Sequence, residues 1–227
     1  IKNLPEGTDP PVIVKFDIDA APVMTIAVSG NRDMREITKL ADDNFSPTFL
    51  RPATAYGVSP RLRFDIVLNN LVAWAHTTGT IRLQSDGSSW RPLIHVRDVA
   101  RAALALLDAP EEVVRGEAFN VGSDVQNYRI RGLAEIVHDR LPHCEVTFAE
   151  GASPDPRSYR VDFSKFESTF PHCRFEWTAE RGTDELARAY AEAGLTFDDF
   201  VGHRYIRLGQ LKRLLDARAL DAELRWK

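Results

Sequence analysis

Apolar and polar residues recur with different periods in different parts of the chain. Residues 1–22 carry four prolines around one short apolar stretch, Val12–Val14, which predicts an extended lead with at most one strand. From about residue 31 to Ala41, apolar residues recur every three or four positions, as one face of a helix requires. Residues 48–55 then predict a buried strand that runs into a turn at Tyr56-Gly57.

Strand and helix patterns continue to alternate after this turn. We expect strands at residues 81–83, 93–96, 118–122 and 145–148, and helices at residues 66–76, 99–107, 130–141, 180–193 and 208–220. Alternating strands and helices, followed by helices alone, are typical of an α/β fold with a mainly helical tail. The predicted fold class is therefore α/β.

Composition and charge exclude several classes of protein. The 227 residues carry 29 Lys and Arg against 33 Asp and Glu, so the net charge of −4 does not favour nucleic acid as a partner. Cys144 and Cys173 have no second ligand at metal-site spacing, so we expect neither a metal site nor a disulfide framework. No apolar run reaches the twenty or so residues of a membrane span, and no signal core begins the chain. We therefore expect a cytoplasmic protein.

Five short motifs follow one another in a fixed order. They are Leu50–Arg63, Asn69-Asn70, Trp90–Ala100 with Asp86-Gly87 before it, Phe119–Gly122 and Arg157–Lys165. In this order they resemble the second half of an extended short-chain dehydrogenase/reductase of the NAD-dependent epimerase/dehydratase family, which acts on nucleotide sugars. The resemblance implies a partial Rossmann-like fold with a mainly helical substrate-binding region. Residues 26–227 would form the C-terminal half of such a protein, after a lead of residues 1–25.

The resemblance also implies a nucleotide-sugar ligand and assigns residues to it. Arg91 and Arg157 could reach a diphosphate, since the planar fork of a guanidinium suits phosphate oxygens. Asn120 would border the nucleotide. Asn69 and Asn70 interrupt an apolar helix face, so we expect one of them to face the sugar cleft. Structural roles remain open for all five: an ion pair for an arginine, a turn cap for Asn120 and solvation for an asparagine.

The family's catalytic pair is a Tyr followed four residues later by a Lys, at the start of a helix. A phenol, with a pKa of about 10, takes a proton near neutral pH only when an ammonium and the oxidised nicotinamide favour its phenolate. Alignment on Leu40–Asp43 and Arg51–Gly57 places Ile26 at the Tyr position and Gly30 at the Lys position. Neither side chain can transfer a proton or hold a charge, so no catalytic residue is assigned.

The resemblance implies NAD(P) as the cofactor. The sequence contains no Gly-x-Gly-x-x-Gly fingerprint, which a pyrophosphate needs in order to approach the backbone. We therefore expect that this chain by itself neither binds NAD tightly nor transfers hydride. It would be either a degenerate relative or a truncated piece of a longer enzyme.

Three functions remain open at this point. The first is an NAD-dependent epimerase/dehydratase-like protein of nucleotide-sugar metabolism that is truncated or degenerate and not redox-active as this chain. The second is a non-catalytic sugar-nucleotide-binding or regulatory protein that pairs with a full-length paralogue. The third is a repurposed enzyme with non-redox chemistry. A homodimer is a further possible assembly. We interpret Tyr56 as packing or cleft wall, His95 as a satisfied core histidine and Asp98 as a helix N-cap.

Overall fold

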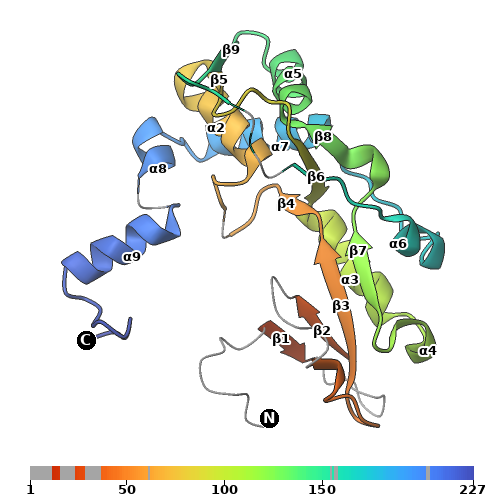
Figure 1. Ribbon diagram of the computed structural model, residues 1–227. Coiled ribbons are helices and arrows are strands. Elements are labelled where there is room, and N and C mark those ends of the chain that lie inside the picture. Colours follow the sequence, from red (N-terminus) through yellow and green to blue (C-terminus); the bar gives the residue numbers. More distant parts are fainter. Residues whose placement is uncertain are drawn as a thin grey trace. The chain divides into compact units, whose positions relative to one another are not determined.

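A computed structural model describes most of the chain (Figure 1). The described residues are 12–15, 24–28, 37–60, 62–153, 155, 158–202 and 205–227, with the backbone alone for 12–15, 24–28 and Arg207. Helices and strands alternate along them, which confirms the α/β class. The chain divides into two compact units. The first comprises Ile1–Ala53, Arg97–Asp124 and Val161–Glu176, and the second comprises Thr54–Val96, Val125–Arg160 and Trp177–Lys227.

In the described part of the first unit, four strands form one mixed sheet. In spatial order they are β1 (Val12–Lys15), β2 (Met24–Val28), β3 (Ser46–Pro52) and β7 (Ala118–Val121). β2 and β7 both run parallel to β3, whereas β1 is antiparallel to β2. Strands of parallel sheets are typically buried on both faces. The first five side chains of β3 are buried accordingly.

Three helices accompany this sheet: α3 (Val96–Leu107), α4 (Glu111–Val114) and α6 (Ser164–Thr169). α3 is amphipathic, since Ala102 and Leu106 are fully buried while Leu104 is exposed. An aromatic cluster joins β7 to α6, where the ring of Phe119 lies 6.2 Å from that of Phe166. Phenylalanine side chains therefore pack β7 against α6 in this unit.

The second unit contains two further small sheets among its described residues. Their strands are β4 (Thr54–Tyr56), β6 (Trp90–His95) and β8 (Asn127–Arg129) in one sheet, and β5 (Thr80–Leu83) and β9 (Glu145–Phe148) in the other. β4 and β6 are parallel and β6 and β8 antiparallel, so β6 is central in the first of these sheets. β5 and β9 are parallel.

Helices supply the main core of the second unit. They are α2 (Val67–Thr78), α5 (Ile130–Arg140), α7 (Ala179–Glu192) and α8 (Phe197–Val201). A 3-10 turn η1 (Asp124–Gln126) and the helix α9 (Arg207–Asp216) complete the described helical elements, and no described side chain of α9 belongs to the core cluster. α2, α5 and α7 contribute Leu68, Val137 and Leu186 to one cluster in which each of these side chains is fully buried. α2 ends at Gly79, whose φ of +71° suits a residue without a Cβ.

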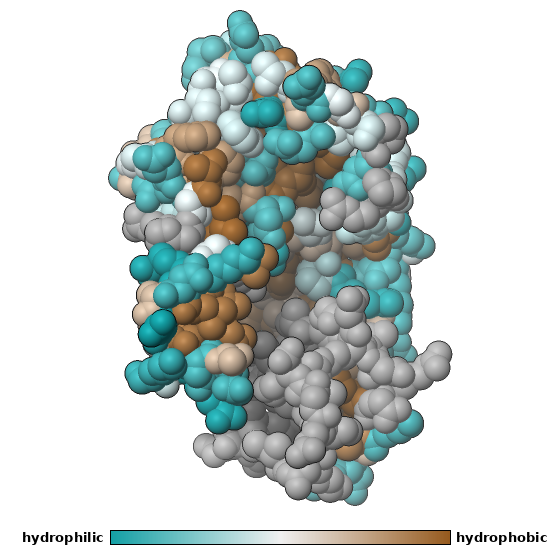
Figure 2. All heavy atoms as spheres, turned by 60° about the vertical axis from the view of Figure 1, so that its left-hand side comes forward, coloured by the Kyte–Doolittle hydropathy of each residue, from teal (hydrophilic) through white to brown (hydrophobic). Residues whose placement is uncertain are grey.

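The end of the chain exposes several apolar side chains. Leu208 on α9 and Trp226 after it are 62% and 74% exposed. Figure 2 shows apolar residues in brown between polar residues in teal on one face of the molecule. Among the described residues, no helix is long and apolar enough to cross a membrane.

Most of the predicted elements are confirmed, with bounds that differ by a few residues. The helix expected at residues 66–76 is α2, that at 130–141 is α5 and that at 180–193 is α7. The strands expected at 81–83 and 145–148 are β5 and β9. These elements have clear periods, which local sequence is enough to reveal.

Other expectations require correction. The single strand expected at residues 48–55 is two strands, because Ala53 interrupts it and donates its N–H to the carbonyl of Val121. Ile26 lies inside strand β2, where it pairs with Thr48, and not at the start of a helix. The helix expected from residue 31 is described only from Ile37, and Gly30 lies outside the described residues.

Candidate functional site

Arg91 lies on β6, and its guanidinium is held from two sides. Its Nη2 lies 2.8 Å from Oδ2 of Asp155, and its Nη1 donates to the carbonyl of Trp90 at 2.7 Å. The side chains of Arg91 and Asp155 are only 14% and 21% exposed. A partly buried ion pair of this kind removes the rotational freedom that a long arginine side chain has in water. The guanidinium is therefore fixed in direction.

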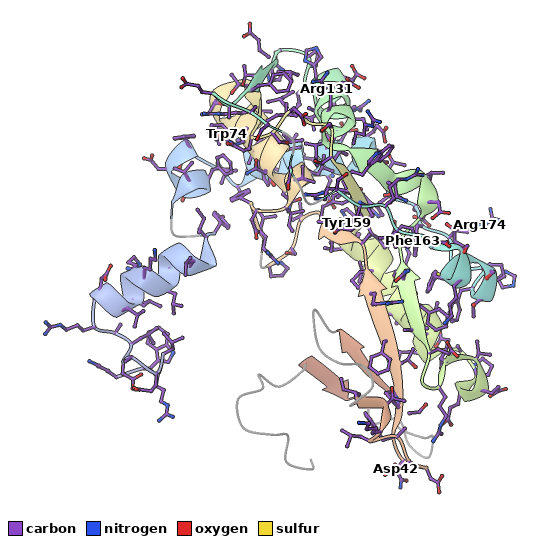
Figure 3. The ribbon with its side chains drawn as sticks, in the orientation of Figure 1. Asp42, Trp74, Arg131, Tyr159, Phe163 and Arg174 are labelled. Carbon is purple, nitrogen blue, oxygen red and sulfur yellow. The ribbon has the colours of Figure 1, made fainter. Side chains whose placement is uncertain are left out.

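The segment that carries Asp155 is fastened to β6. The hydroxyl of Ser89 donates to the carbonyl of Asp155 at 2.8 Å, and the N–H of Tyr159 donates to the carbonyl of Trp90 at 3.3 Å. Figure 3 shows Tyr159 beside this strand, where its ring lies 5.5 Å from Cζ of Arg91. Arg91, Asp155 and Tyr159 together are called the Arg91 site below.

Sequence reasoning found Arg91 but missed both partners in this site. Asp155 stands two residues before the motif that begins at Arg157, and Tyr159 stands within that motif. The sequence offered one signal for these partners, namely an acidic and an aromatic residue within a segment rich in proline and arginine. Arg157 itself lies outside the described residues.

Tyr128 shares the β6–β8 pairing, because it lies opposite Arg91 in the register. Burial raises the pKa of the Tyr128 phenol, and the carboxylate of Glu180 raises this pKa further. The phenol is therefore held in its neutral form at neutral pH. Tyr128 is therefore not a replacement for the family's catalytic Tyr, which has to act as a base.

Asn69 and Asn70 both hold the loop before α2. Oδ1 of Asn69 accepts the N–H of Gly57 at 3.1 Å, and its Nδ2 donates to the carbonyl of Arg63 at 3.0 Å. Nδ2 of Asn70 donates to the carbonyl of Phe64 at 2.8 Å. In the described part of the chain, no hydrogen bond joins either asparagine to Arg91. A contact with a sugar stays a prediction for both.

Asn120 belongs to the first unit, whereas Arg91 belongs to the second. Its Nδ2 donates to the carbonyl of Asp162 at 3.0 Å, which ties β7 to the residues before α6. The hydroxyl and N–H of Ser164 lower the pKa of Asp162, so this carboxylate is charged at neutral pH and fixes the entry to α6. A contact between Asn120 and a nucleotide stays a prediction.

His95 is a satisfied core histidine, as predicted. It is fully buried, its Nε2 lies 2.8 Å from Oε2 of Glu185, and its ring stacks on Trp177 at 3.8 Å. The N–H of Val58 also donates to Glu185, at 3.4 Å. Because water does not reach the His95 ring, this pair serves the turn after β4 and not proton exchange with a ligand. We name His95, Glu185 and Trp177 the His95 network.

Tyr56 and Asp98 also have structural roles. Tyr56 is 1% exposed and donates its hydroxyl to the carbonyl of Thr178, which confirms it as a packing residue. Asp98 is not an N-cap, because α3 begins two residues before it. Both of its carboxylate oxygens instead accept the N–H of Glu176 at 3.2 Å.

The sequence alignment assigned the positions of the family's catalytic pair to Ile26 and Gly30. Ile26 lies in strand β2, where it pairs with Thr48, and Gly30 lies outside the described residues. Neither offers a phenol or an ammonium beside a nicotinamide. Within the ranges that the structure describes, no group of three or more His, Cys, Asp or Glu residues is arranged to hold a metal ion.

Comparison with known proteins connects this geometry to one family. Residues 32–122 match the family model described as the NAD dependent epimerase/dehydratase family. The fold is similar to that of UDP-glucuronic acid 4-epimerase from Bacillus cereus in complex with UDP-glucuronic acid and NAD. The TM-score is 0.57 at 18% identity, over 70% of this chain and 49% of that chain.

Two further solved structures share the fold. RMD from Pseudomonas aeruginosa, complexed with NADPH, has a TM-score of 0.58 at 17% identity, over 70% of this chain and 54% of that one. dTDP-glucose 4,6-dehydratase from Bacillus anthracis, in complex with NAD, has a TM-score of 0.53 at 20% identity, over 64% of this chain and 44% of that one.

The chain spans about half the length of these solved structures. At such identities the likeness shows the fold, which is a partial Rossmann-like fold of the extended short-chain dehydrogenase/reductase type. The matched segment contains the Leu50–Arg63, Asn69-Asn70, Trp90–Ala100 and Phe119–Gly122 motifs. The match to the model of the NAD-dependent epimerase/dehydratase family covers residues 32–122, and the likeness in fold extends over 64–70% of the chain.

Proposed function

We propose that residues 26–227 are the substrate-binding half of an epimerase/dehydratase-type protein and bind the diphosphate of a nucleotide sugar at the Arg91 site. The observation that carries this proposal is the fixed, partly buried guanidinium of Arg91 on a central strand. An arginine that is positioned before the ligand arrives loses little freedom on binding.

The chemistry of the Arg91 site suits a diphosphate. A guanidinium has five N–H donors, and the bonds to Asp155 and Trp90 occupy one on each terminal nitrogen. The remaining donors can bind phosphate oxygens as a fork. Tyr159, 48% exposed beside Arg91, offers an aromatic face next to this cation. UDP-glucuronic acid in the Bacillus cereus epimerase is a ligand of the proposed class.

We further propose that this chain binds its ligand without oxidising it. Ile26 and Gly30 at the family's catalytic positions support this, since neither can accept a proton. The same observation favours a second candidate function, a sugar-nucleotide-binding or regulatory partner of a full-length relative. Under this candidate the Arg91 site binds the same ligand, and catalysis takes place in the relative.

Isothermal titration calorimetry of the full chain with UDP, dTDP and NAD in separate runs tests the proposal. Arg91→Gln is expected to weaken UDP binding roughly ten- to a hundredfold, because a charge-assisted hydrogen bond to phosphate is lost. Arg82→Gln is the matched control, because Arg82 is an exposed arginine that stacks on Trp74. It should bind UDP as the unaltered chain does.

Two outcomes would overturn the proposal. Equal UDP affinity of the Arg91→Gln and Arg82→Gln variants would remove Arg91 from the ligand site. Tight binding of NAD by the unaltered chain would show that a cofactor site exists despite Ile26 and Gly30. Binding of UDP with co-purification of a longer relative would favour the second candidate function over a lone binding protein.

A further inference from the structure

A second cluster of cations lies on the other face of the β6–β8 pair. The strands are antiparallel, and Trp90 pairs with Arg129 while Arg91 pairs with Tyr128. Successive side chains of a strand point to opposite faces, and directly paired residues share a face. Trp90 and Arg129 therefore lie on one face, and Arg91 lies on the opposite face.

Two guanidinium groups contact the indole ring of Trp90. Cζ of Arg129 lies 5.2 Å from the ring centroid, and Cζ of Arg160 lies 4.9 Å from it. Both arginines are exposed, and the ring is half-buried. Cation–π contacts of this length hold each guanidinium against the ring without neutralising its charge. We name these three residues the Trp90 cluster.

The charge balance of the Trp90 cluster differs from that of the Arg91 site. Among the described residues, neither Arg129 nor Arg160 forms an ion pair with a carboxylate, whereas Asp155 pairs with Arg91. By contrast, the exposed arginines Arg82, Arg131 and Arg181 each contact a different aromatic ring. Two cations on one ring repel each other, so the Trp90 cluster is an arrangement that an anion would stabilise.

Helix α5 begins directly after Arg129. Its first turn contains no acidic side chain. That turn contains Arg131 instead, which Figure 3 labels on α5. The N-terminus of a helix carries a partial positive charge that favours anions. The N–H groups of Ile130 and Arg131 already donate to the carbonyls of Ser89 and Gly87, and the Arg131 guanidinium donates to the carbonyl of Asp86. The inference therefore rests on Trp90, Arg129 and Arg160.

We infer that Trp90, Arg129 and Arg160 form a second anion site, which takes the phosphoryl group of a soluble phosphate ester. Two guanidinium forks can bind separate oxygens of one phosphoryl group, and the dianion neutralises both charges. Trp90 holds the forks in place before the ligand arrives. The site is distinct from the Arg91 site, because it lies on the other face of β6, and it does not depend on the function proposed for Arg91.

Inorganic pyrophosphate is the probe for this site. In calorimetry of the full chain, the Arg129→Gln, Arg160→Gln double variant is expected to lose one pyrophosphate-binding event, or to weaken it about tenfold or more. The Arg82→Gln control should retain it, and the Arg91→Gln variant should retain it as well. Binding should weaken as salt is added, because the contacts are between exposed charges.

Tryptophan fluorescence gives an independent readout. Pyrophosphate is expected to change the emission of the unaltered chain, and Trp90→Phe is expected to abolish that change, although three tryptophans remain. Circular dichroism verifies that each variant is folded. Equal pyrophosphate affinity and stoichiometry in the double variant and in Arg82→Gln would overturn the inference. If Arg91→Gln leaves UDP binding unchanged while the double variant loses pyrophosphate, the proposed function fails and the second site stands.

Discussion

At the scale of single residues, a buried polar network fixes the turn after β4. Glu185 contacts His95 and accepts the N–H of Val58, while Asn69 accepts the N–H of Gly57. A buried polar group without a partner costs about 1–3 kcal/mol. The His95 network therefore favours one conformation of this turn. Asn69, for which the sequence suggested a sugar contact, helps to hold the same turn.

Gly57 is the residue of this turn that tolerates substitution least. Its φ is +114°, and a Cβ there would lie 2.3 Å from Nε2 of His95. Gly57→Ala is expected to lower the free energy of unfolding by about 2–5 kcal/mol, because positive-φ strain adds to overpacking. Urea unfolding measures this. Gly79→Ala is the control, with φ of +71° and no atom within 4 Å, and should lose only about 1–2 kcal/mol. Equal losses would contradict the role assigned to His95.

At the scale of elements, helix α7 packs closely against the strand end at Tyr56. A Cβ at Gly182 would lie 2.3 Å from Cε2 of Tyr56, whose hydroxyl is bonded to the carbonyl of Thr178. Gly182 therefore permits an approach that any other residue would prevent. The 3.6-residue period predicted this helix, but the period does not reveal which helical glycine is required.

Gly182→Ala and Gly132→Ala should change stability in opposite directions. Both glycines lie within helices, but a Cβ at Gly132 would meet nothing within 4 Å. Gly132→Ala is expected to raise the free energy of unfolding by about 0.5–1 kcal/mol through helix propensity. Gly182→Ala is expected to lower it by about 1–3 kcal/mol through overpacking against Tyr56. Thermal unfolding compares the two, and stabilisation by Gly182→Ala would refute the packing described.

At the scale of the whole molecule, the proposed function rests on a contrast between Arg91 and Ile26. Arg91 lies in a formed site, whereas Ile26 lies in a strand where the resemblance implied a helix start. This contrast underlies the proposal that the chain binds a nucleotide sugar without oxidising it.

Restoring the pair by Ile26→Tyr and Gly30→Lys is expected not to create hydride transfer. Ile26 pairs with Thr48 in a sheet, and the 227 residues contain no glycine fingerprint for a pyrophosphate. The double variant, NAD and UDP-glucuronic acid should therefore give neither NADH absorbance nor the 4-epimer of the sugar above the level of the unaltered chain. The Bacillus cereus epimerase, with its own NAD, serves as the positive control for ligand quality. Measurable formation of NADH or of the 4-epimer by the variant would refute the proposal.

The candidate site was only partly predictable. Arg91 stands in a motif of contiguous residues, so its position could be matched directly. Its partner Asp155 is 64 residues away, and Glu185 is 90 residues from His95. Asp98 was misread as an N-cap because its true partner, the N–H of Glu176, is 78 residues distant. Contacts over such separations leave no local pattern.

The sequence by itself determined the α/β class, the main helices and the family motifs, because periodicity and contiguous residues are local properties. The tertiary structure alone decided that Ile26 lies in a strand, where the resemblance implied a helix start, since a strand is defined by its pairing with a partner such as β3. It also decided that Trp90 and Arg91 lie on opposite faces of β6. The strand register shows this, because it pairs Trp90 with Arg129 and Arg91 with Tyr128.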